Sequence, residues 1–133
     1  MKRTFLPWIA VLMVLIAMPY CKKSPTDTCS SEAALVITTN PGSNQPPAPG
    51  PTFPLTVTIS SAMPASGVTI EVKARPDGVA TTFFTETRNS TVKDNNFTIT
   101  GTPATITCIV EITVTSKGCG TNKATASYRY SQK

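Results

Sequence analysis

The sequence predicts an all-β protein, a seven-stranded antiparallel β-sandwich, and three observations carry this prediction. From residue 29 onward, apolar and polar side chains alternate in short runs, and no window repeats at the period of a helix. Threonine is frequent, with 23 residues, and its β-branched side chain suits a pleated strand better than a helix. Prolines and glycines separate the runs, as they do at turns.

Seven segments show the alternation of a strand with one buried and one wet face. In chain order they are 33–39, 55–60, 68–74, 80–87, 96–100, 105–116 and 123–130. The longest segment places Cys108 and Val110 on the same face, and the last places Tyr128 and Tyr130 together. Antiparallel sheets with one apolar face must stack to hide these faces, so we expect two sheets around one core.

Three connecting stretches stand out between these segments. Arg75–Gly78 has the proline and glycine of a turn. The Pro- and Gly-rich segment Asn40–Pro54 either blocks pairing at a sheet edge, as prolines do, or forms a stiff docking segment. The polar stretch Thr87–Asn96 is expected as a loop of the kind that carries binding surfaces.

The first twenty residues have the composition of an export signal. Lys2 and Arg3 precede the apolar stretch Phe5–Met18, which is shorter than the ~20 residues of a membrane-spanning helix. Cys21 follows almost directly. This arrangement resembles a bacterial lipoprotein signal peptide, which implies that residues 1–20 are removed and that Cys21 becomes the lipid-bearing N-terminus. The alternative is an uncleaved signal anchor followed by a structural cysteine.

The chain then divides into three parts. Residues 1–20 are the signal peptide, residues 21–28 a short polar tether, and residues 29–131 the folded domain. In its strands and their alternation the domain resembles an immunoglobulin-like or fibronectin type III-like β-sandwich. The only tryptophan is Trp8 in the leader, so the core tryptophan of a true immunoglobulin domain is missing.

Three cysteines remain when Cys21 carries lipid. Export implies an oxidising compartment, where Cys29, Cys108 and Cys119 permit one disulfide and one free thiol. Cys108 and Cys119 flank a hairpin, and six extended steps of ~3.3 Å separate Cys108 from its turn by about 20 Å, whereas disulfide Cα atoms lie ~4.4–6.8 Å apart. In such sandwiches the first strand begins at the pole that carries the last turn. We therefore expect a Cys29–Cys119 disulfide and a buried free thiol at Cys108.

Residue types that serve catalysis are scarce in this chain. It contains no histidine, which removes the usual general base and the commonest ligand of transition metals. Among its acids, Glu71 and Glu111 are expected to project outward, and no carboxylate pair is placed for acid–base hydrolysis. We expect that the protein is not an enzyme and that it uses no cofactor and no metal.

The formal net charge of +5 has its origin at the N-terminal end. From residue 24 onward, eight Lys or Arg residues stand against seven Asp or Glu residues, and they are scattered singly. A basic stripe with interleaved aromatic residues is absent from this sequence, so nucleic acid is not an expected partner.

These features predict a non-catalytic, lipid-anchored binding or structural module in the envelope of a Gram-negative-type bacterium. It would be an outer-membrane lipoprotein, periplasmic or surface-exposed, whose partners are the membrane and an envelope protein or a glycan. One alternative is a fimbrial-type subunit that assembles by strand addition at an exposed edge, either 80–87 or the first strand. The other is a small carbohydrate-binding domain that uses an outward ring of Phe83, Phe84 or Tyr130. A regular strand would turn one of the two phenylalanine rings outward, whereas packing at a bulge or covering of the edge would not.

Overall fold

The structure is a computed structural model, and it describes residues 28–133 apart from 47 and 49. The expected signal peptide, the lipid-bearing Cys21 and most of the tether lie outside the described residues. The described chain begins with one short 3-10 turn, η1 (Thr28–Ser31), and is otherwise built of strands and their connections.

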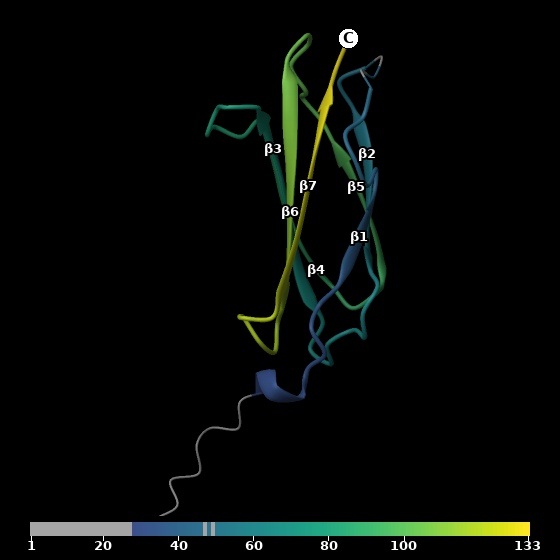
Figure 1. Cartoon of the computed structure of the whole chain (residues 1–133), viewed down its shortest axis with the longest axis vertical. Coiled ribbons are helices and arrows are strands. Elements are labelled where there is room, and N and C mark those ends of the chain that lie inside the picture. The colour runs from purple at the N-terminus through teal and green to yellow at the C-terminus, as the bar shows by residue number, and fades with distance from the viewer. Residues whose placement is uncertain (1–27, 47, 49) are drawn as a thin grey trace, which may run out of the picture.

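The strands form two antiparallel sheets, one of three strands and one of four (Figure 1). The strand bounds are β1 Ile37–Asn40, β2 Phe53–Ile59, β3 Val68–Pro76, β4 Phe84–Ser90, β5 Asp94–Ile99, β6 Thr107–Ser116 and β7 Lys123–Ser131. The first sheet has the order β1-β2-β5 and the second the order β4-β3-β6-β7. The prediction of an all-β fold with two antiparallel sheets is confirmed.

One core fills the space between the two sheets. Alternate side chains of β2, such as Leu55 and Val57, are buried, while Thr56 between them is partly exposed. The same alternation in β3, β6 and β7 buries residues such as Val72, Cys108 and Tyr130 in the same cluster. Both sheets contribute to this cluster, so they stack as the two layers of a β-sandwich.

The strands run between two poles of the sandwich. We call the end with η1 the η1 pole; it also carries the connections 60–67, 91–93 and 117–122. The far pole carries the connections 41–52, 77–83 and 100–106 and the end of β7. The first and last residues of the described chain therefore lie at opposite ends (Figure 1).

Some expected boundaries differ from those in the structure. The first strand is shorter than 33–39, because the backbone N–H of Leu35 donates to the side-chain oxygen of Asn122, 2.9 Å away, before β1 begins. The expected loop Thr87–Asn96 is wrong: β4 continues to Ser90 and β5 starts at Asp94, which leaves only 91–93 as a connection.

The turn expected at Arg75–Gly78 is shifted by one residue. Arg75 and Pro76 end β3, and the N–H of Val79 donates to the carbonyl of Pro76, 3.1 Å away, to close the turn. Gly78 has a φ of 77°, which an L side chain rarely adopts, so glycine is the natural residue at this position of the turn.

Candidate functional site

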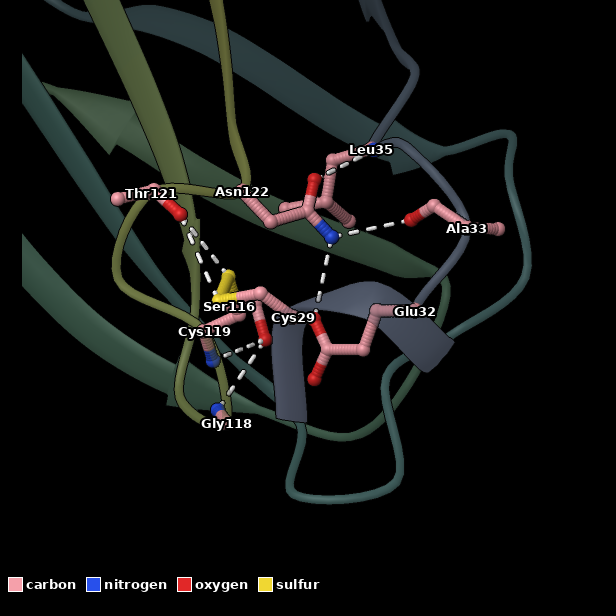
Figure 2. Close-up of a disulfide and its surroundings, with 9 residues drawn as sticks. All are labelled: Cys29, Glu32, Ala33, Leu35, Ser116, Gly118, Cys119, Thr121 and Asn122. Carbon is pink, nitrogen blue, oxygen red and sulfur yellow. Dashed lines mark hydrogen bonds between the residues drawn. A yellow bond between two sulfur atoms is a disulfide. The ribbon is translucent and has the colours of Figure 1, made fainter. Parts of the chain in front are cut away.

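At the η1 pole, a disulfide joins the start of the domain to the turn between β6 and β7 (Figure 2). Cys29 and Cys119 are bonded across a sequence separation of 90, with their Cα atoms 4.9 Å apart. The hydroxyl of Thr121 lies 3.5 Å from the sulfur of Cys29 and 3.1 Å from that of Cys119. The predicted Cys29–Cys119 pairing is confirmed, and its place at the pole agrees with the strand order.

The side-chain amide of Asn122 provides a second attachment at the same place (Figure 2). Its oxygen accepts from the N–H of Leu35, and its nitrogen donates to the carbonyl of Ala33 at 3.0 Å and to Oε2 of Glu32 at 3.1 Å. Both donors of this amide and its acceptor oxygen are thus used in hydrogen bonds to residues 32–35. The chain that enters the domain is fixed to the β6–β7 turn by a covalent bond and by this amide.

Cys108 lies in β6, near the far pole and opposite Tyr130 in β7. It is a buried free thiol, as expected, and its sulfur lies 3.6 Å from the carbonyl of Ile106. Burial raises the pKa of the Cys108 thiol. Since the thiolate is the reactive form, this cysteine behaves as a small apolar side chain and not as a nucleophile.

A regular strand would place one ring of Phe83 and Phe84 outward, and the structure shows the alternative, in which both rings pack inward at a bulge. The N–H of Phe83 donates to the carbonyl of Ala74, 3.0 Å away, while Phe84 is the register partner of the same Ala74. Two residues opposite one form a β-bulge, which breaks the alternation of the strand. Both rings are half-buried and pack against the core.

Tyr130 does not offer its ring to a ligand, which corrects its expected binding role. Its side chain is 1% exposed, and its hydroxyl makes a 2.8 Å hydrogen bond with the hydroxyl of Thr102. Burial raises the pKa of Tyr130 to about 12. The neighbouring Tyr128 is also buried, and its hydroxyl has no hydrogen-bond partner among the described residues.

The Pro- and Gly-rich segment Asn40–Pro54 lies partly along the outer edge of β7. The N–H of Gln45 donates to the carbonyl of Arg129 at 2.8 Å, and the N–H of Ala48 donates to that of Ser131 at 2.9 Å. The side-chain oxygen of Asn44 accepts from the N–H of Arg129 at 2.9 Å. Of the two expectations for this segment, edge blocking describes residues 44, 45 and 48.

The outer edge of β4 was foreseen as an exposed edge, but its charged inner face was not. Alternation puts Phe84, Glu86, Arg88 and Ser90 on the side that faces the other sheet. The Arg88 guanidinium lies 4.5 Å from the ring centroid of Phe97 and donates to the carbonyl of Asn96 at 3.0 Å. Arg88 also forms an ion pair with Glu86. A charged pair at inward positions of "FTETRNS" is a sequence signal for an edge strand.

Four charged side chains on the outer face of the four-stranded sheet form two pairs. Arg75 forms two hydrogen bonds with the carboxylate of Glu111, at 3.0 and 3.1 Å, and Lys73 lies 2.8 Å from Glu71. The hydrogen bond from Arg75 holds the pKa of Glu111 below its usual value. Glu71 and Glu111 do project outward, where they line a shallow hollow with Lys73, Thr113, Thr125 and Ser127. A carboxylate held ionised in this way is a poor proton donor near neutral pH.

Two kinds of feature are absent from the described part of the chain, a metal-type cluster and a membrane-spanning helix. No group of three or more His, Cys, Asp or Glu side chains comes together there in the manner of a metal site. The same part contains no helix with the length and apolar character needed to cross a membrane.

Two surface features stand out among the described residues. The η1 pole fixes the incoming chain, and the outer edge of β4 presents backbone groups to solvent. Comparison of the chain with protein-family models, with curated proteins and with solved structures finds no match.

Proposed function

We propose that this protein is an exported, lipid-anchored and non-catalytic β-sandwich module of a bacterial cell envelope, held at the outer membrane through Cys21. The observation that carries the proposal is the Cys29–Cys119 disulfide, because such bonds persist in oxidising compartments outside the cytoplasm. Cys21 stands eight residues before Cys29 in the sequence, so an acyl chain there would hold the η1 pole near the membrane.

We assign the domain to a seven-stranded, immunoglobulin-like or fibronectin type III-like sandwich. Support comes from the strand order, since β1, β2 and β5 take the places of strands A, B and E of that fold. The strands β3, β6 and β7 take those of C, F and G, and β4 lies beside β3 where an added C′ strand lies.

The test is metabolic labelling of the full chain with a fatty-acid analogue, followed by separation of membranes. We expect label and membrane association in the unchanged chain, loss of both in Cys21→Ser, and retention of both in Cys108→Ser. The second variant is the matched control, because it also removes one thiol but leaves the anchor position intact. Label that persists in Cys21→Ser, or an unlabelled wild-type chain, would falsify the anchor.

A second candidate function is assembly with an envelope partner by strand addition. The observation that favours it is the outer edge of β4, which lies at the margin of the four-stranded sheet. Size-exclusion chromatography of the detergent-solubilised chain over a range of concentrations separates the two functions. Species that grow without limit support strand addition by successive copies, whereas a defined size supports the module.

A further inference from the structure

The outer edge of β4 is free along the strand. Asp77 donates its N–H to the carbonyl of Thr107, 2.9 Å away, so odd-numbered residues at this end of β3 bond to β6 and even-numbered ones to β4. It follows that the backbone groups of Thr85, Thr87 and Asn89 in β4 point away from β3. Within the residues that the structure describes, these groups have no hydrogen-bond partner. Such a row is a template for another strand.

The side chains of β4 determine which strand fits this edge. Glu86 and Arg88 lie on the same inner face, with Thr87 between them. When a second copy of β4 pairs in the antiparallel direction with Thr87 opposite Thr87, Glu86 of each copy lies directly opposite Arg88 of the other. Opposite charges directly across a strand pair stabilise it, and like charges destabilise it. In this register β4 is complementary to itself.

We infer that the outer edge of β4 is a homodimer interface, in which two copies pair antiparallel about Thr87 and join their four-stranded sheets into one. The backbone groups of Thr87 bond to those of Thr87 in the other copy, and those of Thr85 bond to those of Asn89 in the other copy. Arg88 keeps its contacts with Phe97 and Asn96, which lie on the inner side of its own copy.

The same register brings the connections at the two ends of β4 near each other. The connection 77–83 precedes β4 and the connection 91–93 follows it. Across the two-fold axis, the connection 77–83 of one copy therefore lies near the connection 91–93 of the other. These connections carry Val79 and Val92, which are 46% and 60% exposed in the single copy. Removing such side chains from water favours association.

The edges of β7 and β5 fit a second copy less well. The outer groups of Arg129 and Ser131 in β7 are occupied by residues 44, 45 and 48, and a pairing about Thr125 in the remainder would place Lys123 opposite a serine. In β5 the outward carbonyl of Asn96 is already taken by Arg88. Pairing through β4 is isologous and uses up the edge, so it closes at two copies and does not propagate.

The homodimer goes beyond the proposed anchor and does not rest on it. The two-fold axis of the pair stands perpendicular to the joined sheet, so the two η1 poles lie at opposite ends of the dimer. A tether of eight residues (21–28) extends at most about 26 Å, which allows both copies to reach one membrane when the dimer lies flat on it.

The position of Thr87 on the axis gives a direct test with the full chain in its membrane. Paired Cα atoms in this type of position lie ~5.5 Å apart, with their Cβ atoms at the far end of the ~4.5–5.5 Å range, a gap that a short bifunctional thiol reagent spans. Thr87→Cys should therefore be cross-linked by such a reagent into a species of about twice the monomer mass. Thr85→Cys is the matched control: it is exposed on the same face, but its two copies would stand more than ~13 Å apart and should remain monomeric.

A charge exchange in the Thr87→Cys background tests the register. Glu86→Lys alone puts the new lysine opposite Arg88, and Arg88→Glu alone puts the new glutamate opposite Glu86, so each should lose most of the cross-link. A mixture of the two variants, carrying different tags, restores opposite charges in every pair and should cross-link only as the mixed species. Thr87→Pro, measured by sedimentation in detergent, removes the edge N–H without touching the bonds to β3 and should give the monomer.

The outcomes separate cleanly. A cross-link at Thr87 several-fold above that at Thr85, lost in Glu86→Lys and restored in the mixture, supports the homodimer. Equal cross-linking at the two positions, or none at Thr87, overturns the interface. A Thr87 cross-link that Glu86→Lys leaves unchanged overturns the charge-paired register. Because Glu86 pairs only with Arg88 among the described residues, Glu86→Lys is expected to fold, and a thermal melt of that variant checks this.

Discussion

The two outer strands of the four-stranded sheet differ in how their free backbone edges are covered. Part of the β7 edge is bonded to the chain itself, since Asn44, Gln45 and Ala48 satisfy groups of Arg129 and Ser131. The β4 edge has no such cover within the described residues, and it carries the ion pair of Glu86 and Arg88 on its inner side. One edge is partly closed by backbone, whereas the other is open and carries a charged pair beside it.

The difference follows from where the connecting segments run. The chain leaves β1, which pairs with β2, and then lies along β7 before it returns to β2, so one segment bridges the two sheets on that side. On the opposite side β4 and β5 are joined only by 91–93, too short a connection to cover an edge. The side chain of Arg88 bridges that gap, from β4 to the carbonyl of Asn96 in β5.

The largest effect is expected from removing the disulfide at the η1 pole. The double change Cys29→Ser and Cys119→Ser removes a bond that closes a loop of 90 residues, and the chain-entropy model gives a loss of about 4–5 kcal/mol of unfolding free energy. Denaturant unfolding of the two proteins measures it. Hydrogen exchange at Gln45 and Ala48, whose N–H groups cover β7 at the far pole, should become faster only in step with this global loss.

Reduction of the unchanged protein is the matched control for this double change. It should lower the unfolding midpoint to the value of the double variant, because it breaks the same bond without altering a side chain. An unchanged midpoint in both experiments would mean that Asn122 alone fixes the segment 32–35 to the β6–β7 turn.

Much of the fold could be predicted from the sequence, because side chains in a strand alternate with a period of two. The alternation of Leu55, Val57 and Ile59 was enough to identify a buried face, and the two-sheet arrangement followed. The Cys29–Cys119 disulfide could be predicted because strand order fixes which connections share a pole. Strand ends were less accurate, since a side chain such as Asn122 replaces a strand partner of Leu35 without any local signal.

The candidate site was only partly predictable. The outer edge at 80–87 was foreseen, but the alternation rule misplaced the rings of Phe83 and Phe84, because a bulge depends on how the strand meets Ala74. The pairing of Asn44 with Arg129 joins residues 85 positions apart, and backbone groups carry no residue-specific signal for such a contact. Tyr130 was misjudged because its burial depends on Thr102 and on Phe53, whose ring centroid lies 4.3 Å away.

The second largest effect is expected at Arg88, beside the open edge of β4. Arg88→Ala removes the cover of the Phe97 ring and leaves the carbonyl of Asn96 without this partner, which should cost about 2 kcal/mol of unfolding free energy. Lys73→Ala is the matched control, because Lys73 also pairs with a glutamate two residues earlier but on the outer face. Its loss should stay below ~0.5 kcal/mol. Equal losses in the two variants would show that Arg88 contributes only through its ion pair.

A smaller effect is expected from the tyrosines on the inner face of β7. Tyr130→Phe removes the hydrogen bond to the hydroxyl of Thr102. The N–H of Thr102 in turn donates to the carbonyl of Pro51, 3.3 Å away, in the connection between β1 and β2. We expect a loss of about 1 kcal/mol. Tyr128→Phe removes a hydroxyl that has no partner in the described structure, so it should be neutral or stabilise by up to ~1 kcal/mol. Thermal unfolding compares the two, and the opposite order would mean that a water satisfies Tyr128.

The smallest effect is expected from Asp77, whose carboxylate accepts a 2.7 Å hydrogen bond from the side chain of Arg129 above the covered edge. This bond lowers the pKa of Asp77 from its usual value. A carboxyl with a lower pKa in the folded state stabilises the protein above its unfolded pKa of ~3.9, and the contribution is lost as pH falls through the folded value. Asp77→Asn should therefore lose less stability than wild type between about pH 5 and 3. Arg129→Gln should flatten the profile equally, and an Asp77 carboxyl that titrates by NMR at its usual pKa or above would contradict this pairing.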